Sequence, residues 1–249
     1  MAKNIKEKFG SLQSDFVNLT SHQLRTPLSG IKWLLELLQK SDTGNLTKKQ
    51  KDFIEKIYAS NERMIALVND LLEVSRIEEG QNKLYLQPTD IVMVLRGLIR
   101  DKEKQINLKK LKVTFITEQE PFPLVVTEVN KIKQALGNLI SNAITYTQPG
   151  GRVDIDLAIR DNMVVGTITD SGVGIPKSEQ PHVFNKFFRG SNVLEFESLG
   201  TGLGLYITKT FIEASGGKIW FKSPAVSHAG GDDKANKGTT FYFTLPLVK

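Results

Sequence analysis

Apolar side chains in the first 80 residues recur at alternating spacings of three and four, and Pro27 is the only proline there. In residues 53–74 this line consists of Phe53, Ile57, Ser60, Met64, Leu67, Leu71 and Val74. In residues 17–38 it consists of Val17, Ser21, Leu24, Leu28, Ile31, Leu35 and Leu38. Such a repeat is typical of helices that pack side by side. Because a polar turn at residues 41–45 separates the two segments, we expect an antiparallel helical hairpin.

A hairpin alone would leave apolar surface uncovered. A second apolar stripe lies beside the first and consists of Leu12, Phe16, Leu19, Trp33 and Leu37. Dimerisation into a four-helix bundle would cover this stripe. We therefore expect a homodimer formed through the hairpin.

The pattern changes after Gly80 to alternating strand-like and helical segments. Strands are expected at residues 112–117, 152–159, 163–169, 217–222 and 239–247, and helices near 90–107, 128–145 and 202–215. This mixture, with turn signals between the segments, indicates an α/β sandwich. The 249 residues suffice for about one and a half to two domains. The predicted fold class is therefore α+β multidomain, with a boundary near residues 79–87.

Composition excludes several classes of function. The chain has no cysteine and three histidines, which excludes a disulfide framework and a thiolate metal site. The net charge of +6 is spread along the chain. The densest basic stretch, residues 102–112, has no aromatic residues among its charges, so a solvated face is favoured over a nucleic-acid groove. No apolar run is long enough to cross a bilayer and no secretory signal begins the chain, so we expect a cytoplasmic protein, or the cytoplasmic part of a longer membrane-anchored one, that contacts neither nucleic acid nor membrane.

His22 follows Ser21, a position of the apolar line, and so lies about 100° away from that line on a helix. It should face solvent, where a neutral imidazole is a nucleophile that a second domain can reach. Taken alone, a helical histidine is usually a plain surface residue. Pro27 has no N–H for the carbonyl of Gln23, so the helix either kinks there or begins at Pro27 with Thr26 as its N-cap. The unchanged phase of the apolar line across Pro27 favours one kinked helix.

Residues 170–176 have the sequence Asp-Ser-Gly-Val-Gly-Ile-Pro and follow a predicted strand. Asp170 could accept a hydrogen bond from an exocyclic amine, and two glycines after it would let a flat ring approach the backbone. Alone, the segment could also be a turn that ends the strand. Asn138 and Asn142 lie one turn apart on a predicted helix, where they could present amide oxygens to Mg²⁺ on a nucleotide or form a plain polar face.

Three glycines, Gly200, Gly202 and Gly204, precede an apolar helix. This arrangement would expose N-terminal amides of the helix to phosphate oxygens. A P-loop motif is absent from the sequence, and residues 200–205 lack the final glycine of a dinucleotide fingerprint.

The polar loop at residues 190–199 resembles a mobile lid. Lys186 and Arg189, just before it, are placed to reach a terminal phosphate, and neighbouring phenylalanines could anchor its base. The alternative is that these phenylalanines only pack in the core.

Together these segments resemble, in order and spacing, the catalytic core of a bacterial sensor histidine kinase, over nearly the whole chain. Residues 21–28 (SHQLRTPL) resemble the phospho-acceptor box, and residues 138–143 (NLISNA) the asparagine box. Residues 170–176 (DSGVGIP), 183–190 (VFNKFFRG) and 200–205 (GTGLGL) resemble the first glycine box, the phenylalanine box and the second glycine box. Five ordered motifs are highly specific, whereas any single one is not.

The resemblance implies a signalling-helix stub at residues 1–15, a dimerisation and histidine phosphotransfer domain at 16–80, and an ATP-binding domain of the Bergerat fold at 88–249. It implies an enzyme, a protein-histidine kinase that uses ATP and Mg²⁺, phosphorylates His22 and passes the phosphoryl group to an aspartate of a response regulator. The catalytic residues implied are His22, Gln23, Thr26 and Arg189, and the metal ligands are Asn138 and Asn142. The nucleotide-binding residues implied are Asn138, Asn142, Tyr146, Asp170, Gly172, Gly174, Ile175, Lys186, Phe187, Gly200, Thr201, Gly202, Leu203 and Gly204.

The sequence departs from the family pattern in three places. Gln23 stands where the family often has an acidic residue that takes the proton from histidine, so we expect slower autophosphorylation than in a Gln23→Glu variant. Thr145 stands where many relatives have a basic residue near the phosphates. The stretch at residues 224–237 is insertion-like, and we expect a surface loop. In contrast, Thr26 matches a family position associated with dephosphorylating the regulator, so phosphatase activity is a hypothesis.

Two other functions are open at this point. Another ATPase with the same pocket, as in heat-shock chaperones, type II topoisomerases or mismatch-repair proteins, would lack the segment at residues 21–28. The chain could also be a nucleotide-responsive scaffold that binds a partner without transferring phosphate. An acid-labile, alkali-stable label on His22 would exclude the scaffold.

Overall fold

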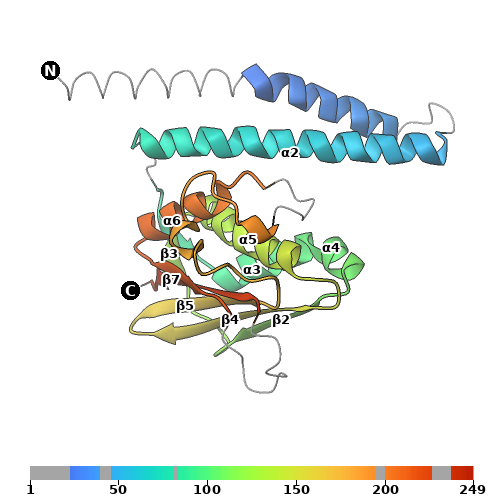
Figure 1. Ribbon diagram of the computed structural model, residues 1–249. Coiled ribbons are helices and arrows are strands. Elements are labelled where there is room, and N and C mark those ends of the chain that lie inside the picture. Colours follow the sequence, from blue (N-terminus) through green and yellow to red (C-terminus); the bar gives the residue numbers. More distant parts are fainter. Residues whose placement is uncertain (1–22, 40–45, 81–83, 194–199, 226–236, 249) are drawn as a thin grey trace. The chain divides into compact units, whose positions relative to one another are not determined.

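The chain forms two compact units, residues 1–83 and 84–249. The computed structural model describes residues 23–39, 46–80, 84–193, 200–225 and 237–248 (Figure 1). Within these ranges, no helix combines the length and the apolar character that a membrane crossing requires.

The described residues of the first unit form two antiparallel helices, one at residues 23–39 and α2 (Lys48–Glu78). Polar contacts between them show the antiparallel arrangement, because residues later in the first helix contact residues earlier in α2. They join Arg25 to Asn69 at 2.7 Å, Lys32 to Glu62 at 3.0 Å and Glu36 to Tyr58 at 3.3 Å. Thr47 begins α2 with a capping box, in which its side chain accepts from the N–H of Gln50 and the Gln50 side chain accepts from the N–H of Thr47. The predicted hairpin is confirmed.

The first helix runs through Pro27 without interruption, so the alternative in which Pro27 begins the helix is wrong. His22 precedes the described part of this helix. The predicted stub at residues 1–15, and Leu12, Phe16 and Leu19 of the second stripe, also lie outside the described residues.

The apolar line that closes the hairpin is not the line predicted from the heptad spacing. On α2 the side chains buried against the first helix lie one position further along the chain, at Ile54, Asn61, Val68 and Leu72. One residue corresponds to a rotation of about 100° about the helix axis. On the first helix Leu28 and Leu35 are buried as expected. Inside this contact the Asn61 Nδ2 donates to the Leu28 carbonyl at 2.9 Å, whereas the buried Asn61 Oδ1 has no partner among the described residues.

The second unit is an α/β sandwich with one five-stranded sheet in the order β2-β4-β5-β7-β6. Only β2 and β4 run parallel, and the other neighbours are antiparallel. A separate two-stranded sheet joins β1 to β3. In chain order, the elements are β1 (Gln87–Thr89), α3 (Ile91–Asp101), α4 (Glu103–Leu108), β2 (Lys112–Thr117), β3 (Val125–Thr127), α5 (Val129–Tyr146), β4 (Arg152–Arg160), β5 (Met163–Asp170), short 3₁₀ turns η1 (Gln180–His182) and η2 (Ser191–Val193), α6 (Gly204–Ala214), β6 (Ile219–Lys222) and β7 (Thr239–Pro246).

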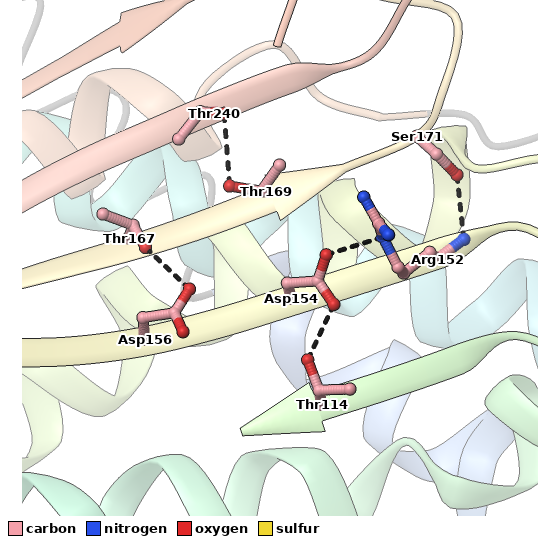
Figure 2. A network of polar contacts seen from close by, with 8 residues as sticks. All are labelled: Thr114, Arg152, Asp154, Asp156, Thr167, Thr169, Ser171 and Thr240. Atoms are coloured by element: carbon pink, nitrogen blue, oxygen red, sulfur yellow. Dashed lines mark hydrogen bonds and ion pairs between the residues drawn. The ribbon is translucent and has the colours of Figure 1, made fainter. Parts of the chain in front are cut away.

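Helices α3, α5 and α6 cover one face of the five-stranded sheet, and the core lies between them and the sheet (Figure 1). Alternate residues of each strand point into this core, as the half-buried pattern predicts. On the opposite face polar side chains pair across neighbouring strands (Figure 2). There Asp154 accepts from Thr114 at 2.7 Å and Thr169 donates to Thr240 at 3.2 Å.

The predicted strands and helices of this unit are found with shifts of a few residues at their ends. The segment predicted as one helix near 90–107 is two helices, α3 and α4, which meet at Lys102. The two three-residue strands β1 and β3 were not predicted, because so short a segment has too few residues to display alternation.

Candidate nucleotide-binding site

Helix α5 contacts the beginning of α6 through Asn138. The Asn138 Nδ2 donates to the Gly204 carbonyl at 3.0 Å and lies 3.4 Å from the Thr208 hydroxyl. These contacts occupy the amide nitrogen and leave Oδ1 available as an acceptor. Asn142 lies one turn later on α5 and is half-buried. Asn138 therefore lies beside the end of the glycine-rich segment, where α6 begins.

The C-terminal end of α5 contacts the other glycine-rich segment. A Cβ atom on Gly172 would lie 2.5 Å from the Tyr146 carbonyl oxygen, so only glycine allows this approach. The Tyr146 hydroxyl lies 3.8 Å from the Cβ position of Gly200. Helix α5 thus brings together residues of both predicted glycine boxes, which are about 30 residues apart in sequence.

Asp170 ends β5 and is only 7% exposed. Its Oδ1 accepts from the N–H of Gly172 at 2.8 Å and from the N–H of Thr239 at 3.3 Å. Burial raises the pKa of Asp170 to about 6, although the two N–H donors act in the opposite direction. Because both donors use Oδ1, Oδ2 is the oxygen left to accept a hydrogen bond from a ligand N–H.

The loop after Asp170 is fixed by hydroxyl groups on both sides. Ser171 and Arg152 exchange two bonds: the Arg152 N–H donates to the Ser171 hydroxyl at 2.8 Å (Figure 2), and the Ser171 N–H donates to the Arg152 carbonyl at 3.0 Å. Further along, the Ile175 N–H donates to the Ser223 hydroxyl at 2.8 Å. Gly174 lies close to the same hydroxyl. These bonds hold the loop in place without a ligand.

The second glycine-rich segment packs on the predicted phenylalanine box. Gly202 has a φ of +70°, and a Cβ atom there would lie 2.6 Å from the backbone of Phe187. Phe187 itself has a φ of +61°, which is unusual for a bulky residue, and its side chain is exposed. The Leu203 N–H donates to the Thr201 hydroxyl at 3.1 Å, and Leu203 is buried.

The segment before the predicted lid also belongs to this cluster. The Lys186 ammonium lies 4.9 Å from the centre of the Tyr206 ring on α6. Arg189 is half-buried. Two hydrogen bonds anchor the start of the predicted lid: the Glu179 carboxylate accepts from the Ser191 N–H at 3.0 Å, and the Asn192 amide donates to the Gly174 carbonyl at 3.0 Å.

Part of the predicted lid, residues 194–199, lies outside the described residues. The same holds for residues 226–236 of the predicted surface loop. At the base of that loop, the Ala225 N–H donates to the Gly238 carbonyl at 3.0 Å.

Lys109 was not predicted to have a structural role, and the reading of residues 102–112 as a solvated face is wrong at this position. Its ammonium donates to the carbonyls of Ile144, Thr145 and Thr147 at 3.0, 2.6 and 3.1 Å. Burial lowers the pKa of Lys109. A cation at a helix C-terminus satisfies carbonyls that have no partner within the helix. Lys109 therefore fixes the end of α5 that contacts Gly172.

Two further contacts were not found from the sequence. The backbone N–H of Thr239 reaches Asp170 because β7 pairs with β5, and no side-chain pattern indicates such a bond. Ser223 contacts Ile175 from the end of β6. The only sequence feature that could have indicated this contact is that Ser223 is a short polar residue at the end of a predicted strand.

The predicted catalytic residues of the hairpin belong to the other unit. Gln23 and Thr26 are exposed on the first helix. The sequence order places His22 directly before Gln23, outside the described residues.

Family models match both units. Residues 12–80 match the His Kinase A (phospho-acceptor) domain, and residues 127–249 match the histidine kinase-, DNA gyrase B-, and HSP90-like ATPase domain. The second unit is therefore an ATP-binding domain of this ATPase type, preceded by a phospho-acceptor hairpin. This combination places the chain in the sensor histidine kinase family, as the catalytic core.

Individual relatives agree with this assignment. The chain is 35% identical to the sensor histidine kinase WalK of Bacillus subtilis (strain 168) over 244 residues, which cover 97% of this chain and 38% of WalK. It is 28% identical to the circadian input-output histidine kinase CikA of Synechococcus elongatus, covering 94% of this chain and 30% of CikA. The chain thus spans only about a third of the length of these relatives.

Solved structures show the same fold. Full-length ShkA in complex with AMPPNP has a TM-score of 0.71 and 25% identity, and the match covers 94% of this chain and 46% of ShkA. The histidine kinase ThkA in complex with the response regulator protein TrrA has a TM-score of 0.62 and 23% identity, covering 98% of this chain and 64% of that chain, which is a likeness of fold. The α+β prediction and the predicted family are confirmed.

Proposed function

We propose that this chain is an ATP-dependent protein-histidine kinase that phosphorylates itself on His22 and passes the phosphoryl group to an aspartate of a response regulator. The observation that supports it best is the convergence on α5, where Asn138 contacts Gly204 and Tyr146 contacts Gly172. Residues 16–80 would form the dimerisation and phosphotransfer domain, residues 88–249 the catalytic domain, and residues 1–15 the end of a signalling helix.

In this proposal Asp170 recognises the adenine base of ATP. Its Oδ2 would accept from the exocyclic amine of adenine, while Oδ1 is held by two backbone N–H groups. Gly172, Gly174 and Ile175 would line the ring, with Tyr146 at its side. Because Oδ1 is already fixed, the position of the accepting oxygen is set before ATP binds.

The asparagine pair fits Mg²⁺. Asn138 has its amide nitrogen bonded to Gly204 and its oxygen available, and the Asn142 side chain makes no hydrogen bond within the described part of the chain. Two amide oxygens one turn apart are the hard ligands that Mg²⁺ takes together with phosphate oxygens. The ion would neutralise charge on the phosphates of ATP.

The segments around the second glycine box would hold the phosphates. Backbone N–H groups at Gly200–Gly204 lie at the start of α6, and a helix N-terminus favours anions. Lys186, Phe187 and Arg189 lie in the segment packed against Gly202. Phosphoryl transfer depends on positioning and charge neutralisation, which Lys186 and Arg189 would supply.

The acceptor would be the His22 imidazole. Gln23 can orient this ring but cannot take its proton, which would pass to water. A dimer formed through the hairpin would present two such histidines. ThkA, which shares this fold, was solved with a response regulator, which supports a regulator as the second substrate.

The decisive experiment incubates the full chain with γ-labelled ATP and Mg²⁺. We expect label on the wild-type chain and on a His228→Ala control, and none on His22→Ala. The label should be stable in alkali and labile in acid. Unchanged label on His22→Ala would overturn the proposal, and binding of ATP without any label would favour the scaffold.

Thr26 supports a second activity towards the same regulator. It is exposed on the first helix and follows His22 by four residues in the sequence, so its side chain can reach a docked partner. We expect Thr26→Ala to slow the decay of a phosphorylated regulator, with Ser29→Ala, also exposed on this helix, as the matched control. Equal decay with both variants would contradict a role for Thr26.

A further inference from the structure

Strand β2 is one edge of the five-stranded sheet and pairs only with β4. The N–H groups of Lys112 and Glu118 donate to Gly151 and Leu157 on the β4 side. In a strand, successive N–H and C=O groups point to alternate sides, so those of Val113, Phe115 and Thr117 point away from the sheet. Within the described part of the chain, nothing bonds to them. This edge therefore offers three residues of unpaired backbone.

Apart from Lys112 at its start, the edge lacks the features by which proteins usually protect edges. Its sequence, Lys-Val-Thr-Phe-Ile-Thr, is rich in strand-forming residues and contains no proline and no inward-pointing charge. Ile116 is 60% exposed on the face opposite the helices. The other edge strand, β6, has four residues against the six of β2. An added strand would cover Ile116 and pair the free backbone groups.

A groove of about 630 Å³ runs beside this edge, between β2 and the helices α3 and α4. Its apolar floor consists of Ile99, Ile106, Leu111, Val113 and Phe115. Val113 and Phe115 line this floor, and they are also residues whose backbone N–H and C=O groups point away from the sheet. A strand that pairs with β2 would therefore insert every second side chain into the groove. Backbone pairing with pockets for alternate side chains is the geometry of strand addition.

The charged residues that line the groove are Arg96, Arg100 and Glu103, and the chain segment around them is basic. Residues 96–112 include seven lysines and arginines but only two acidic residues. Lys109 points towards α5 and Arg96 is paired with Glu120, but Arg100 and Lys112 form no ion pair with any described residue. Two copies of this edge would bring like charges together, which disfavours pairing of β2 with β2. An acidic strand would meet opposite charge.

We propose that the edge of β2 and its groove form a docking site for an extended acidic peptide that alternates apolar and acidic residues and adds to the sheet as a sixth strand. The site is separate from the nucleotide-binding residues and does not depend on the proposed kinase activity.

The test uses the full chain and a fluorescein-labelled, N-acetylated decapeptide of alternating valine and glutamate. We expect the glutamate peptide to bind at least about tenfold more tightly than the same peptide with lysine, by fluorescence anisotropy in low salt. Arg100→Glu should weaken binding about fivefold or more, whereas Lys133→Glu, an exposed charge reversal on α5, should change it less than about twofold.

Backbone pairing is tested by hydrogen exchange and by Val113→Pro. The peptide should protect the N–H groups of Val113, Phe115 and Thr117, but not those of Thr114 and Ile116, which face β4. Val113→Pro removes one outward donor without breaking the β4 ladder, so it should weaken binding about tenfold while autophosphorylation persists. If that variant does not fold, the exchange pattern of the wild-type chain still decides.

Three results would overturn the proposal. They are equal binding of the lysine and glutamate peptides, protection at another part of the chain, and protection of Val113, Phe115 and Thr117 without peptide at rising protein concentration. The last result would identify a second copy of this chain as the occupant.

Discussion

Ionisation of Asp170 should oppose the stability of the ligand-free ATP-binding unit. The carboxyl group is buried, and its pKa in the folded chain is about 6, against an ordinary value of 3.8. The folded state therefore holds the proton more tightly than the unfolded state between these two values. Stability from the protonated group is complete below about pH 4 and is lost as the pH rises through about 6. At about 1.4 kcal/mol per pH unit, the full loss is about 3 kcal/mol.

The substitution Asp170→Asn removes this titration and keeps the shape. The asparagine Oδ1 can still accept from the N–H groups of Gly172 and Thr239. Its Nδ2 is a buried donor in place of Oδ2 and adds a constant cost of about 1–3 kcal/mol. That cost does not vary with pH. We therefore expect the stability of the variant relative to wild type to rise by about 2–3 kcal/mol from about pH 4 to about pH 7.5.

Urea unfolding followed by tryptophan fluorescence measures this difference. The chain has two tryptophans, and a Trp33→Phe background leaves Trp220 on β6 as the reporter of the second unit. Asp101→Asn, which changes an exposed carboxyl group at the end of α3, is the matched control. A relative stability that stays constant within about 0.5 kcal/mol, or that falls with pH, would refute the reasoning.

Ionisation of Asp170 should strengthen the binding of ATP, although it lowers the stability of the ligand-free unit. A proton on Asp170 would sit on Oδ2, because Oδ1 already accepts two N–H groups. The adenine amine would then face a donor instead of an acceptor. Below about pH 6 the affinity of the wild-type chain for ATP should fall by up to about tenfold per pH unit, relative to Asp170→Asn at the same pH. Parallel pH profiles for the two proteins would exclude Oδ2 as the adenine contact.

Three other substitutions test separate contacts. Lys109→Met removes three hydrogen bonds at the end of α5, so the free energy of unfolding in urea should fall by about 2–3 kcal/mol, while Lys109→Arg should recover part of it. Gly202→Ala forces a Cβ atom against the Phe187 backbone and should weaken ATP binding at least about tenfold by calorimetry, whereas Gly97→Ala, in open space on α3, should leave binding unchanged and stabilise by about 0.5–1 kcal/mol. Gln23→Glu supplies a base beside His22 and should raise the initial rate of autophosphorylation about tenfold or more; an equal or lower rate would show that the proton passes elsewhere.

Much of the candidate site was predictable because its residues act through local geometry. Asp170 and Gly172 are two residues apart, and the asparagines are one helical turn apart, so their spacing alone indicates what they can do. The contacts that were missed join distant segments. The Thr239 N–H lies 69 residues from Asp170 along the chain, and strand pairing alone brings them together. Lys109 was taken for a solvated charge because only the folded chain places three carbonyls around it.

In the hairpin, the spacing of apolar residues predicts the helices, but it does not predict which face of α2 packs against the first helix. The predicted line on α2 contains large side chains that remain 39–52% exposed in the single chain, namely Phe53, Ile57, Met64 and Leu67. The line one residue further on, through Ile54, Asn61 and Val68, closes the hairpin instead. A two-helix hairpin requires only one buried line on each helix, so a second line of this size on the same helix has no function within one chain. Its heptad spacing is what a second copy of the hairpin would pack against, which supports the proposed homodimer. If the proposed homodimer forms, the sequence specifies two adjacent contacts, and the stronger heptad signal belongs to the contact between the two copies.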